Sequence, residues 1–512
     1  MQTLESFVAG RWAAGSGDRV VLDNPSTEEP LAEVARGGLD LGEAVAWGRD
    51  VGGAALRAMT LVERAGMLGA LSKALREHRE ELLDLSQQNG GNTRGDAKFD
   101  VDGAIGTLAA YGAWGKACGE RGWLVDGEGV QLGRTPRFWG EHLRVPKVGL
   151  AVHVNAFNFP AWGMGEKMAC ALLAGVPVLE KAGTASAVLA WRLAQLVVGS
   201  GVLPEGAFQF LAGSVGDLLD HLGPQDVVAF TGSADTGRKV RGNANLIAHN
   251  VRVNIEADSI NAAILGPDVG DEDEVWNEFL GNVVVDMTQK AGQKCTAVRR
   301  VLVPADRADA VAEELAARLA DIRVGDVADG QVRMGPVASR AQLADVRAGI
   351  AGLQAAADVV CGGPAPIADK GWFVAPTLLR ARDPEAAVLH EREVFGPCAT
   401  VVPYEGGAAE AVRLTNRGGG SLVASLYSND RGFVTEVVTG IAPWHGRVWI
   451  GSEKSAGQTL GPGAVLPASV HGGPGRAGGG EELGGLRGLE PYTQRVARQG
   501  DKGRVSRFTS GE

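Results

Sequence analysis

Short apolar runs alternate with amphipathic stretches through residues 149–255, and this alternation predicts a doubly wound α/β domain. Buried strands are expected at 149–154, 176–179, 208–211, 227–230 and 251–255. Helices are expected between them at 161–173, 186–198 and 215–222, and from Ser233 onward. Alternating strands and helices with short connections are typical of a parallel sheet with helices on both faces. Such sheets bind ligands beyond the carboxyl ends of their strands, so we expect a site at that edge.

A second alternation occupies roughly residues 260–450 and predicts a second α/β domain, to which Cys295 belongs. Its strands are expected at 301–303, 359–361, 400–402 and 448–450, with a helix at 309–319. Near the start of the chain, residues 1–50 are typical of short strands and turns. Residues 51–118 are predicted to be helical, because apolar residues between Leu56 and Leu75 recur at helical spacing.

Two further segments fit neither domain. Residues 125–147 are polar, with Gly, Arg and Pro, and are expected to form an extended excursion with which the tail 489–512 could pair. Both segments are poorly suited to burial within one subunit. We therefore expect strands from two subunits to pair, in a homodimer at least.

A glycine-rich segment, residues 455–488, has 12 Gly in 34 positions. Its composition is compatible with a disordered linker. We favour an ordered loop at the active site, because a chain end that could dock still follows it.

The composition is typical of a soluble globular enzyme with two or three domains: 512 residues, 45% hydrophobic, with a mean hydropathy of -0.01. The net charge is -11 and no long basic run occurs, which argues against nucleic acid or an anionic membrane as a partner. No apolar run reaches the ~18 residues of a membrane span. The N-terminus lacks a secretory signal, so a cytoplasmic location is expected. Five widely spaced cysteines without ligand spacing predict neither a disulfide framework nor a metal.

Three separated side chains could together oxidise an aldehyde through a covalent thioester. They are Cys295 in Gly292-Gln293-Lys294-Cys295-Thr296, Glu256 about forty residues earlier, and Asn158 before Phe159-Pro160. A thiolate attacks the carbonyl carbon, an amide holds the oxyanion, and a carboxylate deprotonates the water that releases the acid. Each residue alone has an ordinary explanation, as a buried thiol, a solvated carboxylate or a turn residue.

The turn that opens with Gly232-Ser233 follows a strand and begins a helix. A P-loop is excluded, because Arg238 replaces its Lys and Val240 stands where a hydroxyl is needed. The turn is then either a helix N-terminus that receives a pyrophosphate, with Ser233 as its first polar contact, or an ordinary capped helix. Lys181 lies at the carboxyl end of the strand that begins at Val176. It is either a ligand for ribose or phosphate or a solvated surface residue.

The chain resembles the aldehyde dehydrogenase superfamily nearly from end to end. The motifs that carry the resemblance are specific and in the family's order: Asn158-Phe159-Pro160, Phe230-Thr231-Gly232-Ser233, Gly292-Gln293-Lys294-Cys295 and Glu393-Val394-Phe395-Gly396-Pro397. The resemblance implies the aldehyde dehydrogenase fold, with a Rossmann-like cofactor domain (1–124 and 148–257), an α/β catalytic domain (258–488) and a small oligomerisation extension (125–147 and 489–512).

The resemblance also implies roles for individual residues. Cys295 would be the nucleophile, Glu256 the general base, and Asn158 an oxyanion donor together with the backbone N–H of Cys295. The implied cofactor contacts are Glu393 at the nicotinamide ribose, Phe395 beside the nicotinamide ring, Lys181 at the adenine ribose, and Phe157, Thr184, Gly232 and Ser233 around them.

Three departures from the family pattern carry further expectations. Asp258 places a second carboxylate near Glu256 and would raise the pKa of Glu256 if the two approach. Thr184 stands where many NAD-using members carry a Glu that would repel a 2′-phosphate, which predicts NADP, with NAD a weaker alternative. The ending 470–485, together with Glu256-Ala257-Asp258-Ser259, resembles the dehydrogenase half of the ring-opening fusion enzyme of phenylacetyl-CoA breakdown. It also resembles a stand-alone branch that oxidises 3,4-dehydroadipyl-CoA semialdehyde in aerobic benzoate degradation.

These expectations leave several functions open. The favoured one is NADP-dependent oxidation of a CoA-linked semialdehyde to a free acid. The alternatives are oxidation of a free aldehyde, a CoA-acylating reaction, and a structural protein without activity. Acylating members generally lack the general base, so Glu256 favours hydrolysis, and the intact set of Asn158, Glu256 and Cys295 argues against an inactive protein.

Overall fold

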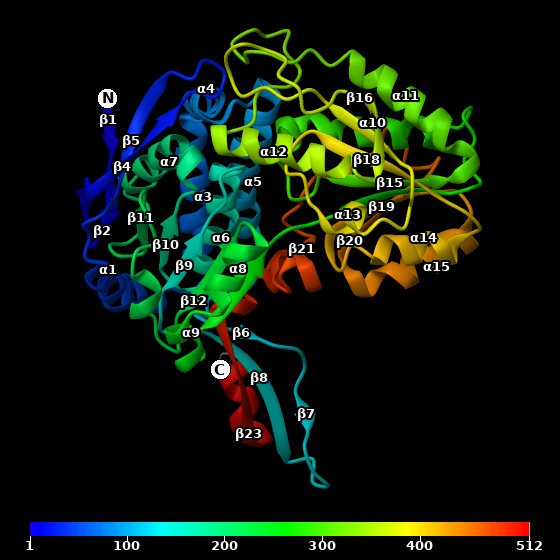
Figure 1. Cartoon of the computed structure of the whole chain (residues 1–512). Helices are drawn as coiled ribbons and strands as arrows, with labels where there is room; N and C mark the ends of the chain where they lie inside the picture. The colour runs from blue at the N-terminus through cyan, green and yellow to red at the C-terminus, as the bar shows by residue number, and fades with distance from the viewer. Residues whose placement is uncertain (511–512) are drawn as a thin grey trace.

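The computed structural model describes residues 1–510 and contains two large sheets that lie side by side (Figure 1). The first has seven strands in the order β13-β12-β9-β10-β11-β2-β3. The strands of its central part are parallel, and β2 joins β11 in antiparallel orientation. The bounds are β2 Ser6–Val8, β3 Arg11–Ala13, β9 Ala151–Val154, β10 Val178–Lys181, β11 Phe208–Leu211, β12 Val227–Thr231 and β13 Arg252–Glu256.

Helices cover both faces of this sheet, as the alternation of strands and helices predicts. The helices that pack on one face are α3 Leu61–Glu77, α4 Arg79–Gly90, α5 Arg94–Lys116, α6 Pro160–Ala174 and α7 Ala187–Gly199. The other face carries α1 Leu41–Trp47, α8 Ala234–Arg241 and α9 Ala244–Ala248. Side chains of successive strand residues alternate between the two cores, so that Val178 and Phe210 point to one and Leu179 and Leu211 to the other.

The second sheet also has seven strands, in the order β16-β17-β18-β15-β14-β19-β20. Their bounds are β14 Asn261–Leu265, β15 Val298–Pro304, β16 Ala357–Cys361, β17 Thr377–Ala381, β18 Cys398–Tyr404, β19 Ser421–Tyr427 and β20 His445–Gly451. One face is covered by α10 Glu274–Thr288 and α11 Ala308–Ala320. The other is covered by α12 Arg340–Leu353, α13 Ala387–Glu391, α14 Ala408–Asn416 and α15 Arg431–Ile441.

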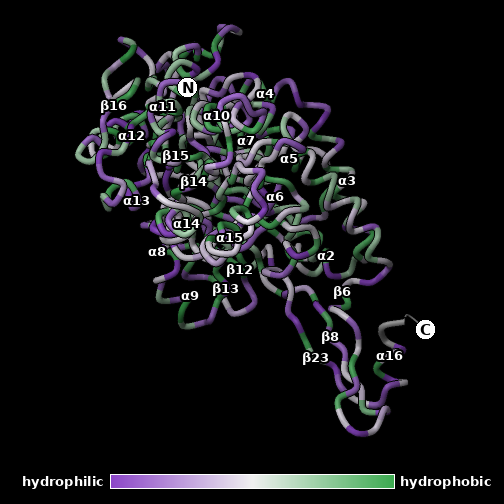
Figure 2. The backbone as a smooth tube through the Cα atoms, turned by 90° about the vertical axis from the view of Figure 1, so that its right-hand side faces the viewer, coloured by the Kyte–Doolittle hydropathy of each residue, from purple (hydrophilic) through white to green (hydrophobic). Residues whose placement is uncertain are grey.

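A long extension projects from the body of the molecule (Figures 1 and 2). Its main strands, β8 Phe138–Pro146 and β23 Thr493–Asp501, pair antiparallel, and β6 Leu124–Val125 and β7 Val130–Gln131 also pair with β8. The predicted pairing of the tail with the excursion is therefore present within one chain. Helix α16 Lys502–Ser510 follows β23.

The glycine-rich segment follows an ordered path that returns to the first sheet, as favoured from the sequence. It forms a small two-stranded sheet of β21 Val470–Gly472 and β22 Glu481–Leu483, with a 3-10 turn, Gly475–Ala477, between them. Gly480 donates its N–H to the carbonyl of Ile255, and Ala257 donates to the carbonyl of Ala477. This segment is therefore attached to the end of β13, where Glu256 lies.

One expected helix is absent. Residues 215–222 form only a short 3-10 turn, Leu218–His221, because Gly216 has a φ of 52° and interrupts a regular helix. The short strands expected in residues 1–50 are present, but this range also contains an unpredicted helix, α1, which Asp40 caps by accepting a hydrogen bond from the N–H of Glu43. Strands β1 Gln2–Leu4, β4 Ser16–Asp23 and β5 Pro30–Gly37 form a separate three-stranded sheet. Within residues 1–510, no helix has both the length and the apolar character needed to cross a membrane.

Candidate active site

Two adjoining cavities lie beyond the carboxyl ends of the first sheet, one of about 1040 Å³ and one of about 40 Å³. Both are lined by Asn158, Glu256 and Cys295. These three residues lie up to 137 positions apart in the chain, and the structure brings them to the junction of the two cavities. The edge of the sheet at which the sequence predicted a ligand is therefore the edge that carries the candidate chemistry.

Cys295 stands on a tightly constrained loop after α10. Lys290, Ala291 and Gly292 have φ values of 54°, 51° and 68°, so three successive residues adopt the left-handed conformation. A Cβ on Gly292 would lie 2.2 Å from the carbonyl oxygen of Gly396, so only glycine fits there. The buried guanidinium of Arg299 donates to the carbonyls of Gly292, Lys294 and Gly396. These bonds hold the loop in one position and present the thiol to the cavity.

Asn158 and Glu256 are positioned by the first sheet. Asn158 follows β9 and precedes Pro160, the first residue of α6, and its side-chain amide donates to the carbonyl of Gln293 at 3.0 Å. Glu256 is the last residue of β13 and is 2% exposed. Because both side chains come from the ends of parallel strands, a shift of either strand would move the site.

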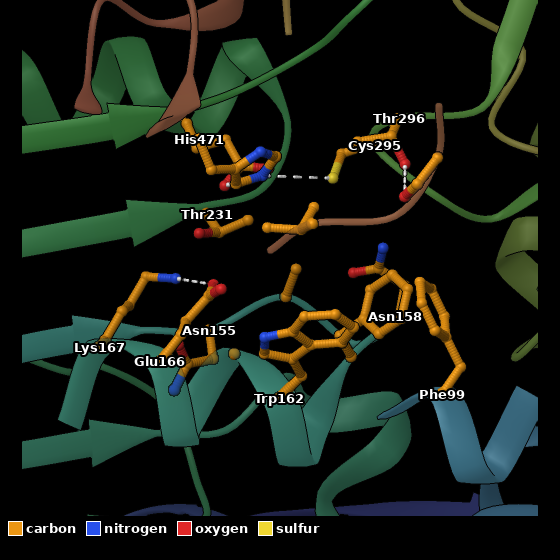
Figure 3. Close-up of a pocket in the computed structure, with 16 residues that line it drawn as sticks. Phe99, Asn155, Asn158, Trp162, Glu166, Lys167, Thr231, Cys295, Thr296 and His471 are labelled. Carbon is orange, nitrogen blue, oxygen red and sulfur yellow. Dashed lines mark hydrogen bonds and ion pairs between the residues drawn. The ribbon is translucent and has the colours of Figure 1, made fainter. Parts of the chain in front are cut away.

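A histidine that the sequence analysis did not single out, His471, faces the thiol of Cys295 in the small cavity (Figure 3). Nε2 of His471, on β21, is 3.2 Å from Oε2 of Glu256 and 3.9 Å from Sγ of Cys295. Burial lowers the pKa of His471, but the charge of Glu256 outweighs this and raises it. Burial raises the pKa of Glu256, and the charge and hydrogen bond of His471 reverse this shift and lower it. Burial and the neighbouring Glu256 raise the pKa of the Cys295 thiol.

Glu166 and Lys167 add a second set of charged side chains to the lining of the small cavity. The amino group of Lys167 is 3.2 Å from carboxylate oxygens of both Glu166 and Glu482. Glu482 is directly opposite His471 in the β21–β22 ladder. Burial raises the pKa of Glu166. A Glu-Lys pair inside an otherwise apolar helix is a signal that sequence reasoning could have used, because such charges are rarely buried without partners.

The large cavity collects the residues that the resemblance assigned to a cofactor. Its lining includes Phe157, Lys181, Thr184, Gly232, Ser233, Glu393 and Phe395. Ser233 is the N-cap of α8 and accepts a hydrogen bond from the N–H of Thr236, so the capped-helix interpretation is confirmed as a local structure. Burial lowers the pKa of Lys181 to about 8, which is not the behaviour of a solvated surface lysine.

The opposite wall of this cavity holds Glu393 and Phe395. The ring of Phe395 meets that of Phe157 edge to face, with centroids 5.9 Å apart, and the guanidinium of Arg299 lies over it. One carboxylate oxygen of Glu393 accepts from the N–H of Ser259, and burial raises the pKa of Glu393 to about 7. Its other oxygen makes no hydrogen bond within the described chain, although Arg299 is 3.7 Å away. Buried polar atoms without partners in an open cavity are typical of a site that receives a polar ligand.

The size of the cavity and the glycines in its wall also suit a dinucleotide. Cβ atoms added at Gly183 and Gly232 would approach the backbone of Phe157 and the ring of Phe230 within 2.5 and 2.7 Å. Glycine at both positions therefore allows close packing within the wall and adds no side chain to the cavity. A nicotinamide dinucleotide would be held by Lys181 and Thr184 at one end and by Glu393 and Phe395 at the other.

The expected influence of Asp258 on Glu256 is wrong. One oxygen of Asp258 accepts from the N–H of Ala234 at 2.8 Å, and the other is 3.8 Å from Arg476. Its charge helps to raise the pKa of Glu393, whereas the pKa of Glu256 is lowered. The reason is that Asp258 follows Glu256 by two residues but turns to the N-terminus of α8, while His471 occupies the space beside Glu256.

A model of the aldehyde dehydrogenase family matches residues 12–497. The chain is 46% identical to a 3,4-dehydroadipyl-CoA semialdehyde dehydrogenase of Aromatoleum evansii, over 92% of this chain and 93% of that protein. It is 29% identical to a hydroxyisobutyraldehyde dehydrogenase of Mycolicibacterium austroafricanum, over 95% and 92% of the two chains.

The solved structures that resemble this one include an aldehyde dehydrogenase C variant from Pseudomonas syringae in complex with NAD⁺ and octanal. That protein is 27% identical and superimposes with a TM-score of 0.84, over 97% of this chain and 96% of the other. The family match spans the second sheet, the parallel part of the first sheet and most of the extension, so the fold, the order of the motifs and the comparisons agree. The chain belongs to the aldehyde dehydrogenase family.

Proposed function

We propose that this aldehyde dehydrogenase oxidises a CoA-linked semialdehyde to a carboxylic acid with NADP, through a thioester on Cys295. The observation that carries the proposal is the meeting of Cys295, Glu256 and Asn158 at the junction of the two cavities. The aldehyde carbon would lie at this junction, with its chain in the small cavity and the nicotinamide in the large one.

Each of these residues has a distinct task in the proposed reaction. The Cys295 thiolate attacks the aldehyde carbon, and the oxyanion that forms accepts hydrogen bonds from the Asn158 amide and the backbone N–H of Cys295. The bound nicotinamide supplies the hydride acceptor. Glu256 then deprotonates a water molecule that attacks the thioester, which releases the acid and restores the thiolate. This hydrolytic step favours a free acid over a CoA-acylating reaction.

The proposed preference for NADP rests on the charge around Lys181 and Thr184. The neighbouring Glu180 is completely buried, and its carboxylate oxygens bind the side chains of His153 at 2.6 Å and Asn155 at 2.8 Å. It therefore does not face the cavity and would not repel a 2′-phosphate. A charge-assisted hydrogen bond between Lys181 and this phosphate would contribute about 1.5–3 kcal/mol.

The proposed substrate class rests on the similarity to the Aromatoleum evansii protein, whose name states its substrate. The small cavity is compatible with an apolar acyl chain, because Phe99, Phe159 and Trp162 pack edge to face along its wall. Its volume of about 40 Å³ has room for only the part of the chain next to the aldehyde, so the rest of the substrate and a CoA group would lie outside this cavity. We further propose that this enzyme acts in aerobic benzoate degradation, the role that the sequence resemblance implies.

The predicted assembly and location are part of the same proposal. The terminal strand of the second sheet, β20, exposes Ile450 at 44% and could receive a strand from the extension of a partner subunit, giving a homodimer. We also propose the predicted division of the chain into a cofactor domain (1–124 and 148–257), a catalytic domain (258–488) and an oligomerisation extension (125–147 and 489–512). A reducing compartment such as the cytoplasm suits a chain whose five cysteines are all free.

The test is a comparison of kcat/KM for NADP and NAD with free and CoA-linked aldehydes of the same chain length. The proposal requires a higher kcat/KM with NADP and with the CoA-linked semialdehyde, and a carboxylic acid as the product. A Thr184→Glu variant should shift the preference toward NAD, because the new carboxylate would repel the 2′-phosphate. Equal use of both cofactors by the unmodified enzyme, or a preference for free aldehydes, would refute the corresponding part of the proposal.

A further inference from the structure

We propose that Arg476 binds the pyrophosphate of the nicotinamide cofactor and supplies the positive charge that helix α8 does not provide there. This inference rests on the proposed function only in taking the large cavity as the cofactor site. It does not depend on the choice between NADP and NAD, because both cofactors carry the same pyrophosphate. The sequence resemblance assigned no role to this arginine.

The N-terminus of α8 lines the large cavity, but groups of the protein already occupy part of it. The N–H of Ala234 donates to a carboxylate oxygen of Asp258 at 2.8 Å, and the N–H of Thr236 donates to the side chain of Ser233 at 3.3 Å. A helix N-terminus binds phosphate through its free N–H groups and its positive dipole. In α8 two N–H groups of the first turn are used, and the Asp258 carboxylate opposes the dipole. The helix alone is therefore a weak site for an anion.

Among the described residues, the cationic side chains that line the large cavity are Lys181, Arg392 and Arg476. Lys181 ends β10, at the end proposed for the adenine ribose. Arg392 packs against α12, where a Cβ on Gly352 would lie 2.4 Å from its guanidinium. Arg476 is 3.8 Å from an oxygen of Asp258, the carboxylate that caps α8. Arg476 is therefore the cation that the structure places beside the N-terminus of this helix.

The guanidinium of Arg476 has hydrogen-bond donors that the protein does not use. Its Nε is buried and has no hydrogen-bond partner within residues 1–510. The separation of 3.8 Å from Asp258 allows an electrostatic attraction but is too long for a hydrogen bond. A guanidinium presents its N–H groups in a planar fork that matches two oxygens of a phosphate. Unused donors of this kind in the wall of an open cavity favour an anionic ligand.

Arg476 also acts on the part of the cavity that would hold the nicotinamide ribose. Burial raises the pKa of Glu393, the charge of Asp258 adds to this rise, and the charge of Arg476 opposes it. Both charges are therefore close enough to influence the carboxylate proposed to hold that ribose. The pyrophosphate is attached to the same ribose in the cofactor. A cation near both Glu393 and α8 is thus in position to bind it.

The backbone around Arg476 is held in place from both large sheets. The N–H of Arg476 donates at 2.9 Å to the carbonyl of Gly419, which precedes β19 of the second sheet. The guanidinium of Arg241, at the end of α8, donates at 2.6 Å to the carbonyl of Gly478. Figure 1 shows β21 and the turn that follows it next to α8. Because the turn is already fixed, little conformational freedom would be lost when the cofactor binds.

Cofactor binding without turnover tests this inference. Calorimetric or fluorescence titration gives Kd for NAD, NADP and ADP-ribose in the unmodified enzyme, Arg476→Met, Arg476→Lys and Arg487→Met. Arg487 is an exposed arginine of the same glycine-rich segment and serves as the control. We expect Arg476→Met to weaken the binding of all three ligands by roughly ten- to a hundredfold, the effect of losing a charge-assisted hydrogen bond. Arg476→Lys keeps the charge and should lose less, and Arg487→Met should match the unmodified enzyme.

A fragment of the cofactor separates this role from the one proposed for Lys181. Adenosine 2′-phosphate has no pyrophosphate, so Arg476→Met should leave its Kd unchanged, whereas Lys181→Met should raise it. An unchanged Kd for NAD and ADP-ribose in Arg476→Met, shown to be folded by circular dichroism, would overturn the inference. A loss confined to NADP would also overturn it, because it would place Arg476 at the 2′-phosphate. If the unmodified enzyme prefers NAD, the NADP part of the proposed function fails, and the expected losses for NAD and ADP-ribose still decide the role of Arg476.

Discussion

At the scale of single residues, the burial of Lys181 predicts how the affinity for NADP depends on pH. Burial lowers its pKa to about 8, below the usual 10.5, because the amino group loses solvent without a carboxylate partner. A bound 2′-phosphate would favour the charged form and raise this pKa again. Affinity for NADP should therefore fall as the pH rises through about 8, by up to about tenfold per pH unit. Affinity for NAD, which lacks the phosphate, should change little over the same range.

Calorimetric or fluorescence titration of both cofactors from pH 6.5 to 9.5 measures this effect. A Lys181→Met variant should bind NADP more weakly and without the pH dependence, and its loss of affinity for NAD, which keeps only the ribose contact, should be smaller. A parallel pH dependence for NAD and NADP would show that Lys181 does not contact the phosphate.

The same scale shows how far the sequence predicts the site. Cys295, Glu256 and Asn158 could be found because each lies in a recognisable motif, and the structure brings them to one junction. His471 was missed because its position depends on the path of a glycine-rich segment that returns to β13 from more than two hundred residues away. The error over Asp258 has the same origin, since sequence separation says nothing about the direction in which a side chain turns.

At the scale of elements, the contact between the glycine-rich segment and β13 depends on the absence of a side chain at Gly480. A Cβ there would lie 2.5 Å from the carbonyl oxygen of Ile255 and 2.8 Å from the side chain of Asn254. Gly480→Ala should therefore push β22 away from β13, lower the free energy of unfolding by about 1–3 kcal/mol and reduce kcat. The activity falls because His471 and Glu256 separate.

Thermal unfolding and steady-state kinetics check this prediction, with Gly330→Ala as the matched control. Nothing lies within 4 Å of a Cβ at Gly330, so this variant should keep the Tm and kcat of the unmodified enzyme. If Gly480→Ala behaves like Gly330→Ala, the close packing on β13 does not position the site.

Elements with regular periodicity were predicted well from the sequence, and irregular ones were not. The parallel strands of the first sheet and helices α6, α7 and α11 lie within a few residues of their predicted ranges, because the strands are short buried apolar runs and the helices bury a regular apolar face. The helix expected at 215–222 is interrupted by the left-handed backbone of Gly216, and the two-residue strands of the extension depend on pairing with β8, which no local pattern contains.

At the scale of the whole molecule, the extension leaves apolar side chains in solvent. Val130 on β7 and Val496 on β23 are 51% and 43% exposed in the single chain. A projecting, partly apolar strand pair is costly for a monomer and is typical of an association surface. Val496→Asp should therefore shift the predicted dimer toward a monomer, because a carboxylate would be buried at the interface without a partner.

Sedimentation velocity at micromolar concentration measures this shift. Val360→Asp is the control, because Val360 is 36% exposed on β16 at the opposite edge of the second sheet from β20. The control should sediment as the unmodified enzyme does. A monomeric unmodified enzyme, or a Val496→Asp variant with unchanged assembly, would contradict the proposed role of the extension.

The central claim, that the acyl group is carried on Cys295 and released by Glu256, is tested most directly by trapping the thioester. Glu256→Gln is mixed with NADP and an accepted aldehyde, quenched in acid and examined by peptide mass spectrometry. We expect a burst of reduced cofactor close to one per active site, steady turnover lowered by ~10²–10⁴, and an acyl group on the peptide that contains Cys295. Cys295→Ala should show neither burst nor adduct while binding NADP within a few fold of the unmodified enzyme. Turnover by Cys295→Ala, or a Glu256→Gln enzyme without both burst and adduct, would contradict the account.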